Sequence, residues 1–160
     1  MGVSEILTPE RVSVAGEAEG LVRSKPEAVR RLSALLAHRQ TIFTADDVEK
    51  VLIERERIQS TGIGSGVAMP HGRVPSLDRF IGAVLLCPSP IAFDAIDSAP
   101  VSILFAIIGP PGEAGEHLKW LARISKLLRD EGFRGRLLKA RTGRSAFELI
   151  AAEDGRTVSP

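Results

Sequence analysis

Two uninterrupted apolar segments, Ile81–Cys87 and Val101–Ile108, constrain the fold of this chain more than any other feature. Each is bounded by glycine or proline and lacks the apolar–polar alternation of a strand with one face in water, so each predicts a strand buried on both faces. Patterns typical of helices precede and follow these segments. The sequence therefore predicts a single α/β domain whose mixed sheet is covered by helices on both faces.

Capping signals predict where the flanking helices begin. Ser24 is expected to cap one helix with Pro26 in its first turn, and Thr44 and Asp47 form the capping pair of a second. The apolar face of this second helix is expected to contain Val48, Val51, Leu52 and Ile58. Three further helices are expected, a long one that carries Leu118, Leu121, Ala122, Ser125 and Leu128 and two short ones near 133–141 and 145–152, together with an edge strand near 11–15.

Composition fits one ordinary globular domain spanning residues 1–160, with an ordered core of about 5–152 and a disordered tail at 154–160. The 21 basic and 20 acidic side chains leave a net charge of +1, which gives no electrostatic reason for binding to nucleic acid or to anionic lipid. Cys87 is the only cysteine, so no internal disulfide can form. The sequence shows no signal-peptide pattern and no apolar run long enough to span a bilayer, so a cytoplasmic location without membrane insertion is expected.

The segment Arg55–Arg73, which reads RERIQSTGIGSGVAMPHGR, is the most informative about function. Its alternating glycines, Gly62, Gly64 and Gly66, permit backbone conformations that other residues resist, and such a loop can turn several N–H groups toward an anion. It is not a nucleotide-binding loop, because it has no G-K-[ST] and its G-x-G-x-G spacing differs from the dinucleotide fingerprint. A plain glycine-rich turn between a helix and a strand is the alternative interpretation.

His71 follows Pro70 at the end of this segment. A neutral imidazole is a good nucleophile near neutral pH, and the phosphoramidate that it forms keeps a high potential for transfer, as a reversible relay requires. An isolated histidine beside a turn is more often a plain surface residue. The residues that accompany His71 therefore decide between these two readings.

Two residues are candidates to act together with His71 in such a site. Arg55 lies four residues after Val51 and three after Leu52, so it projects from the apolar stripe of the second helix, and its guanidinium offers paired donors for phosphate. His117 lies in the first turn of the third helix, where N–H groups and the helix dipole favour an anion. On local grounds alone, Arg55 could equally lie at the edge of the core, and His117 could be an ordinary polar residue of a first turn.

The ordered motif R-E-x-x-x-S-T-G-I-G-x-G-[IV]-A-x-P-H resembles the phosphorylation-site motif of the mannitol/fructose/nitrogen-regulatory type of enzyme IIA in the bacterial phosphotransferase system. Its residues here are Arg55, Glu56, Ser60, Thr61, Gly62, Ile63, Gly64, Gly66, Val67, Ala68, Pro70 and His71. The resemblance continues through 71–79, 90–97 and 117–128 and covers roughly residues 7–152. Met69 and Val67 replace residues that are usually Ile in the family, a change that should affect packing and not chemistry.

This resemblance implies a fold, a site and a set of partners. The fold would be a mixed sheet of about five strands flanked by helices. His71 would accept a phosphoryl group on Nε2 beside Arg55 and His117, with Thr61, Gly62, Gly64 and Gly66 in the phosphate loop. The donor would be a histidine-containing phosphocarrier protein, supplied from phosphoenolpyruvate through enzyme I. No cofactor and no metal would take part.

The family contains two branches that the chain could belong to. The FDAID segment at 93–97 and the lack of fused membrane or IIB regions look most like the nitrogen-regulatory branch, whose downstream partners would be regulatory proteins. A sugar-specific IIA that passes phosphate to a IIB domain is the alternative. A protein-binding regulator with a vestigial phosphosite is a third reading. A metal-dependent hydrolase is disfavoured, because neither His71 nor His117 has further metal ligands near it in the sequence.

Overall fold

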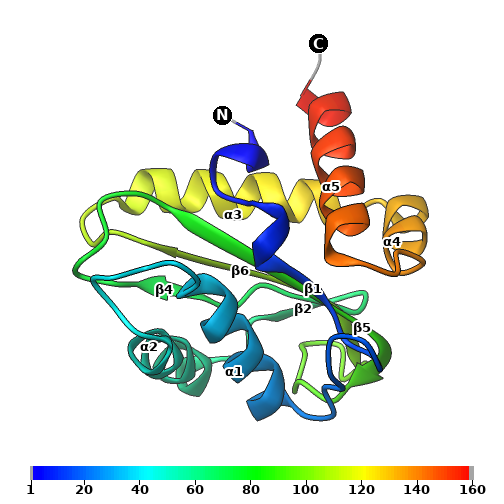
Figure 1. Cartoon of the computed structure of the whole chain (residues 1–160), viewed down its shortest axis with the longest axis horizontal. Coiled ribbons are helices and arrows are strands. Elements are labelled where there is room, and N and C mark those ends of the chain that lie inside the picture. The colour runs from blue at the N-terminus through cyan, green and yellow to red at the C-terminus, as the bar shows by residue number, and fades with distance from the viewer. Residues whose placement is uncertain (1, 159–160) are drawn as a thin grey trace.

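The computed structural model describes residues 2–158, with side chains through residue 156. In this range the chain forms one mixed sheet of six strands, covered by helices on both faces (Figure 1). The strands are β1 (Val12–Val14), β2 (Gly62–Gly64), β3 (Val67–Ala68), β4 (His71–Arg73), β5 (Ile81–Ile91) and β6 (Val101–Gly109). The helices are α1 (Lys25–Leu36), α2 (Ala45–Ile58), α3 (Ala114–Leu128), α4 (Glu131–Leu137) and α5 (Gly143–Val158), and short 3₁₀ turns lie at Val3–Glu5 and Pro9–Arg11.

The α/β architecture predicted from the two apolar segments is confirmed. Strands β5 and β6 pair antiparallel at the centre, β1 joins β5 in parallel, and both β3 and β4 join β6 in parallel. The strand order is β1-β5-β6-β3-β2, with β4 beside the other end of β6. The described range therefore has one strand more than the five or so expected, because the polar stretch from His71 to Arg73 extends the edge of the sheet as β4.

Alternate residues of the central strands enter two separate cores. Leu85 and Leu104 pack with α1 and α2 on one face, whereas Val84 and Phe105 pack with α3, α4 and α5 on the other. This is why neither apolar segment shows polar alternation. Cys87 lies in the first core, and its burial raises the pKa of the thiol to about 11.

The predicted helix starts are confirmed by their capping contacts. The Ser24 hydroxyl accepts a hydrogen bond from the backbone N–H of Glu27 at 3.3 Å, and Pro26 lies in the first turn of α1. Thr44 and Asp47 form a complete capping box at the start of α2, with distances of 3.2 and 2.9 Å. The predicted strand near residues 11–15 is β1, at one end of the sheet.

Two large apolar residues that were expected on buried helix faces are exposed, as is the small Ala122 of the same predicted set on α3. Ile58 at the end of α2 is 81% exposed, because it lies about 120° around the helix axis from Leu52. Leu118 on α3 is 66% exposed, since the buried stripe of that helix runs through Trp120 and Ile124, and Leu118 lies about 160° away from Trp120. These predictions were therefore wrong.

The prediction of a disordered tail at 154–160 is wrong for residues 154–158, which lie in helix α5. Helix α5 continues to Val158, and residues 159–160 lie outside the described range. Asp154 is 4% exposed; it accepts hydrogen bonds from Arg123 at 2.8 and 3.0 Å and from the backbone N–H of Val3 at 3.0 Å. The last turns of α5 are ordered because this buried carboxylate joins α5 to α3 and to the start of the chain.

Candidate functional site

The candidate site is an open cleft of about 600 Å³ at the edge of the sheet where β4 lies. His71, on β4, lines it together with Arg55 from α2, Thr61 and Gly62 from the segment that leads into β2 and β3, and Leu118 from α3. Helices α2 and α3 cover opposite faces of the sheet (Figure 1). Because β4 is at the edge, residues from both faces reach the same cleft.

The backbone on both sides of His71 holds its ring in place. The preceding β3 and the strand β4 itself are both paired to β6. Gly72 packs so closely against α2 that a Cβ added there would overlap the side chain of Val51. A glycine is therefore required beside His71 for α2, and with it Arg55, to approach β4.

A hydrogen bond fixes the tautomer of His71. Its Nδ1 lies 2.7 Å from the carbonyl oxygen of Met69, and since a carbonyl can only accept, Nδ1 carries the proton and donates. In the neutral ring, Nε2 then keeps the lone pair. Burial lowers the pKa of His71 below its ordinary 6.5, and the charges of Arg55 and Arg73 lower it further, against the raising effects of the Met69 carbonyl and Glu56. The ring of His71 is consequently neutral near neutral pH, with the lone pair on Nε2.

His117 lies against His71 from the first turn of α3. The two ring centroids are 5.3 Å apart and the planes are inclined at 55°, with Phe80 near the His117 ring at 5.8 Å. The side chain is 6% exposed, and its buried Nδ1 has no hydrogen-bond partner among the described residues. Burial, followed by the charges of His71 and Arg73, lowers the pKa of His117 to about 4.

Arg55 reaches the cleft from the α2 side. It is half-buried, and its Nη1 donates a hydrogen bond to the carbonyl of Gln59 at 2.9 Å, at the end of its own helix. This contact directs the guanidinium along the final turn of α2 toward the segment Ser60–Gly62, which also lines the cleft. The structure thus brings Arg55 and His117 to His71 from opposite faces of the sheet.

The four predicted loop residues fall into two pairs. Thr61 and Gly62 line the cleft, whereas Gly64 and Gly66, with φ of 99° and 78°, form the turn of the β2–β3 hairpin and do not line it. The N–H of Thr61 donates to Glu56 at 3.0 Å, and that of Gly62 donates to the Ser60 hydroxyl at 3.1 Å. These two N–H groups are therefore engaged within the protein instead of being turned outward to an anion.

Two residues near the site had no role assigned from the sequence. Glu56, whose side chain is 7% exposed, accepts hydrogen bonds from both the N–H and the hydroxyl of Thr61 and lies 2.8 Å from Nζ of Lys25. Arg73 lies two residues after His71 on β4, hence on the same face of the strand, and its charge affects both histidines. The sequence could have indicated Arg73, because alternate residues of a strand share a face and Arg73 is two residues after His71. For Glu56 the sequence offers only its position next to Arg55.

No group of three or more His, Cys, Asp or Glu side chains within residues 2–158 is arranged to hold a metal ion. In the same range, no helix is at once long enough and apolar enough to cross a bilayer.

Comparison with known proteins decides the family. The model of the family described as "Phosphoenolpyruvate-dependent sugar phosphotransferase system, EIIA 2" matches residues 5–153. The chain belongs to this family. The EIIA 2 match begins at the last residue of the first 3₁₀ turn and ends within α5, so it covers the whole cleft around His71.

Several relatives of this family resemble the chain at different levels of sequence identity. A nitrogen regulatory protein from Bradyrhizobium diazoefficiens is 34% identical over 94% of this chain and 95% of its own length. The crystal structure of the nitrogen regulatory protein IIA-Ntr from Neisseria meningitidis has a TM-score of 0.83 at 30% identity, covering 92% of this chain and 98% of that one. The mannitol IIA of Escherichia coli, solved in a complex with phosphorylated IIB, shares the fold at 20% identity, with a TM-score of 0.73 over 91% of this chain and 97% of that one.

Proposed function

We propose that this chain is a phosphocarrier that accepts a phosphoryl group on Nε2 of His71 and acts as a nitrogen-related regulatory switch in the cytoplasm. The donor is a histidine-containing phosphocarrier protein, supplied from phosphoenolpyruvate through enzyme I. The observation that carries the proposal is the hydrogen bond from Nδ1 of His71 to the Met69 carbonyl, which leaves Nε2 as the nucleophilic nitrogen of a ring that lines an open cleft.

The proposed step is an in-line transfer between two imidazoles. The bond from phosphorus to the donor's nitrogen breaks as the bond to Nε2 of His71 forms, and the electron pair of the broken bond returns to the donor's ring. Such a reaction depends on positioning and on charge stabilisation more than on covalent catalysis. Arg55 offers paired donors to the phosphoryl oxygens, and the neutral ring of His117 can add one N–H.

Exposed apolar residues around the cleft support binding to partner proteins. Ile63, Ile96 and Leu118 are 47%, 75% and 66% exposed, and all three line the cleft with His71. Large apolar side chains that gather on the surface mark sites of protein contact. A carrier protein that docks here would bring its phosphohistidine to Nε2 and exclude water from the transfer.

Transfer to a IIB domain, as in a sugar-specific IIA, is the second candidate for the downstream step. The mannitol IIA of the same fold is solved with phosphorylated IIB, which supports an acceptor of that kind. The identity to nitrogen regulatory proteins over nearly the whole chain favours regulatory partners instead. A regulator that works by contact alone, with a vestigial phosphosite, is disfavoured by the convergence of Arg55, His71 and His117.

The test is phosphorylation of the purified chain with phosphoenolpyruvate, enzyme I and the carrier protein. Wild type should gain one phosphoryl group on a histidine, labile to acid and stable to mild alkali. His71→Ala should gain none, whereas His38→Ala, which changes an exposed histidine on another part of the surface, should be labelled as wild type. Label on His71→Ala, or none on wild type, would overturn the proposal.

A further inference from the structure

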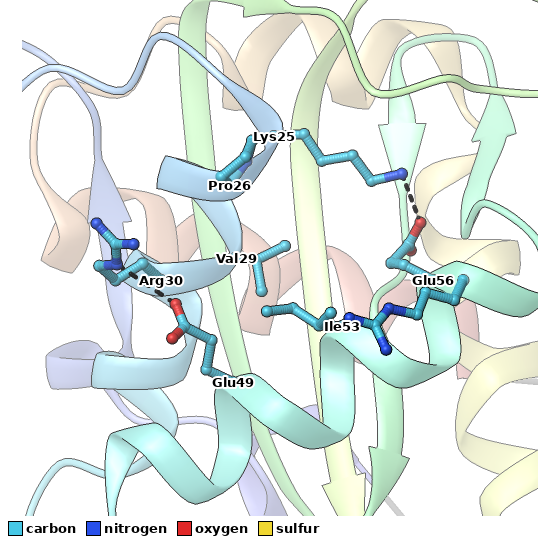
Figure 2. A pocket seen from close by; sticks show the side chains of 8 residues that line it. Lys25, Pro26, Val29, Arg30, Glu49, Ile53 and Glu56 are labelled. Atoms are coloured by element: carbon cyan, nitrogen blue, oxygen red, sulfur yellow. Dashed lines mark hydrogen bonds and ion pairs between the residues drawn. The ribbon is translucent and has the colours of Figure 1, made fainter.

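A second pocket, separate from the His71 cleft, lies between α1 and α2 (Figure 2). Its volume is about 380 Å³, within the range of small-molecule sites, and it shares no lining residue with the cleft. Figure 2 shows Val29 of α1 and Ile53 of α2 directed toward each other, with Pro26 nearby. Ile53 is 38% exposed although it lines this apolar wall, so an apolar ligand would remove its surface from water.

The charged side chains that line the pocket include more cations than anions. Arg30 and Glu49 pair at 3.4 Å, and Lys25 and Glu56 pair at 2.8 Å (Figure 2). Arg57 is the fifth charged residue of the lining; it is exposed, and it makes no ion pair with the described residues. The lining residues therefore carry one cation in excess, Arg57, which favours a ligand with a single negative charge; the exposed Asp94, outside the lining, lies 3.8 Å from Nζ of Lys25.

We propose that this pocket binds a small aliphatic monocarboxylate and that its occupancy is transmitted to the His71 cleft. The branched apolar body of the ligand packs on Val29 and Ile53, and its carboxylate binds Arg57 and competes with Glu56 for Lys25. This ligand class fills the apolar wall and neutralises the excess charge at the same time.

Glu56 provides the connection between the two sites. On the side of the pocket its carboxylate pairs with Lys25, and on the side of the cleft it accepts both hydrogen bonds of Thr61. Lys25 has other partners when it moves from Glu56, because its Nζ lies 3.3 Å from the Phe93 carbonyl, 4.5 Å from the Phe93 ring centroid and 3.8 Å from Asp94. A ligand that draws Lys25 away leaves the buried carboxylate of Glu56 without its cation, which disturbs the position in which that carboxylate accepts the hydrogen bonds of Thr61. This second part rests on the proposed function.

The binding test is an NMR titration of the whole chain with 4-methylpentanoate, with 4-methylpentanamide and 4-methylpentylamine as the neutral and cationic counterparts. The carboxylate should give saturable shifts in α1 and α2, the amide should bind about tenfold more weakly through loss of a charge-assisted contact, and the amine should not bind. Arg57→Gln should weaken carboxylate binding about tenfold. No saturable shifts with the carboxylate, or equal binding of all three probes, would overturn the proposal.

Two matched substitutions on α2 separate the pocket from the general surface. Ile53→Asp should abolish binding, because it places a carboxylate on the apolar wall. Ile58→Asp makes the same change at an exposed isoleucine of the same helix that does not line the pocket, and binding should persist. Equal losses in both variants would refute the assignment of the pocket.

The effect of the pocket on the His71 cleft can be measured separately from binding. Saturating 4-methylpentanoate should move the amide resonance of Thr61 in wild type and slow phosphoryl transfer to His71 several-fold, and Lys25→Met should suppress both effects. An unmoved Thr61 resonance in the bound protein would refute the transmission. Absence of transfer even without ligand would count against the proposed function alone, whereas normal transfer without carboxylate binding would count against the pocket alone.

Discussion

His117 should make the stability of this protein depend on pH in a way that can be isolated. Its pKa is about 4 in the folded protein and near 6.5 when the residue is free in water. At pH values between these two, the unfolded chain binds a proton that the folded chain does not, so acidification favours unfolding. The stability tied to the neutral ring is complete above about pH 6.5 and is lost progressively as the pH falls toward 4.

The magnitude follows from the displacement of the pKa. One pKa unit corresponds to about 1.4 kcal/mol, so the full displacement is worth about 3 kcal/mol, of which about 2 kcal/mol is lost between pH 7 and pH 5. The side chain is 6% exposed, so little of this is screened by solvent. His71, whose pKa is also lowered by burial, contributes in the same direction.

The assay is urea unfolding of wild type and His117→Gln at several pH values between 7 and 5. Subtracting the two free energies cancels the groups that do not interact with His117, and the difference should fall by about 2 kcal/mol over this interval, while the titration of the coupled His71 is followed separately in each protein. An NMR titration of the His117 ring should place its midpoint near pH 4. A midpoint near 6.5, or parallel pH profiles for the two proteins, would refute the reasoning from burial.

Further predictions concern the site and the end of the chain. Arg55→Ala should slow single-turnover transfer from phosphorylated carrier to His71 about 10²–10³-fold, and Arg55→Lys should recover part of the rate; a wild-type rate in folded Arg55→Ala would show that Arg55 stabilises no charge. Phosphorylation of His71 adds about −1.5 to −2 charges beside His117 and should raise the pKa of that ring, which NMR of the phosphorylated protein can detect; an unchanged titration would place the phosphoryl group elsewhere. Asp154→Ala should lower the free energy of unfolding, measured in urea, by about 3 kcal/mol, because it leaves Arg123 and the Val3 N–H without their acceptor. The control Glu148→Ala, at an exposed position of the same helix, should change that free energy by less than about 0.5 kcal/mol. Equal effects of the two substitutions would mean that the Asp154 contacts do not stabilise the fold.

The fold was predictable where the signal is local. The runs at β5 and β6 and the caps at Ser24 and Thr44 depend on neighbouring residues, and the structure confirms them. The faces of α2 and α3 were less predictable. Ile58 and Leu118 are apolar, yet the choice of buried face depends on which stripe meets the sheet, and that is set by tertiary packing.

The candidate site shows the same division. His71 stands out because its own sequence neighbourhood is distinctive, and the Met69 carbonyl that fixes its tautomer is only two residues away. The roles of Glu56 and Arg73 could not be assigned, because they depend on Lys25, Thr61 and His117 reaching the same edge of the sheet. For the same reason the ordered end of α5 was missed, since its anchor joins residues 151 positions apart.

That anchor has a consequence for the order in which the protein is made. The N–H of Val3 is synthesised 151 residues before its acceptor on Asp154. Until then Arg123, already in place on α3, lacks the carboxylate that neutralises it. A nascent chain can therefore join the Ile6 carbonyl to the N–H of Gly82 once β5 is present, whereas the N–H of Val3 stays without its acceptor until α5 has formed. In chains that stop before residue 154, the amide of Val3 should consequently exchange its hydrogen faster than in the full chain.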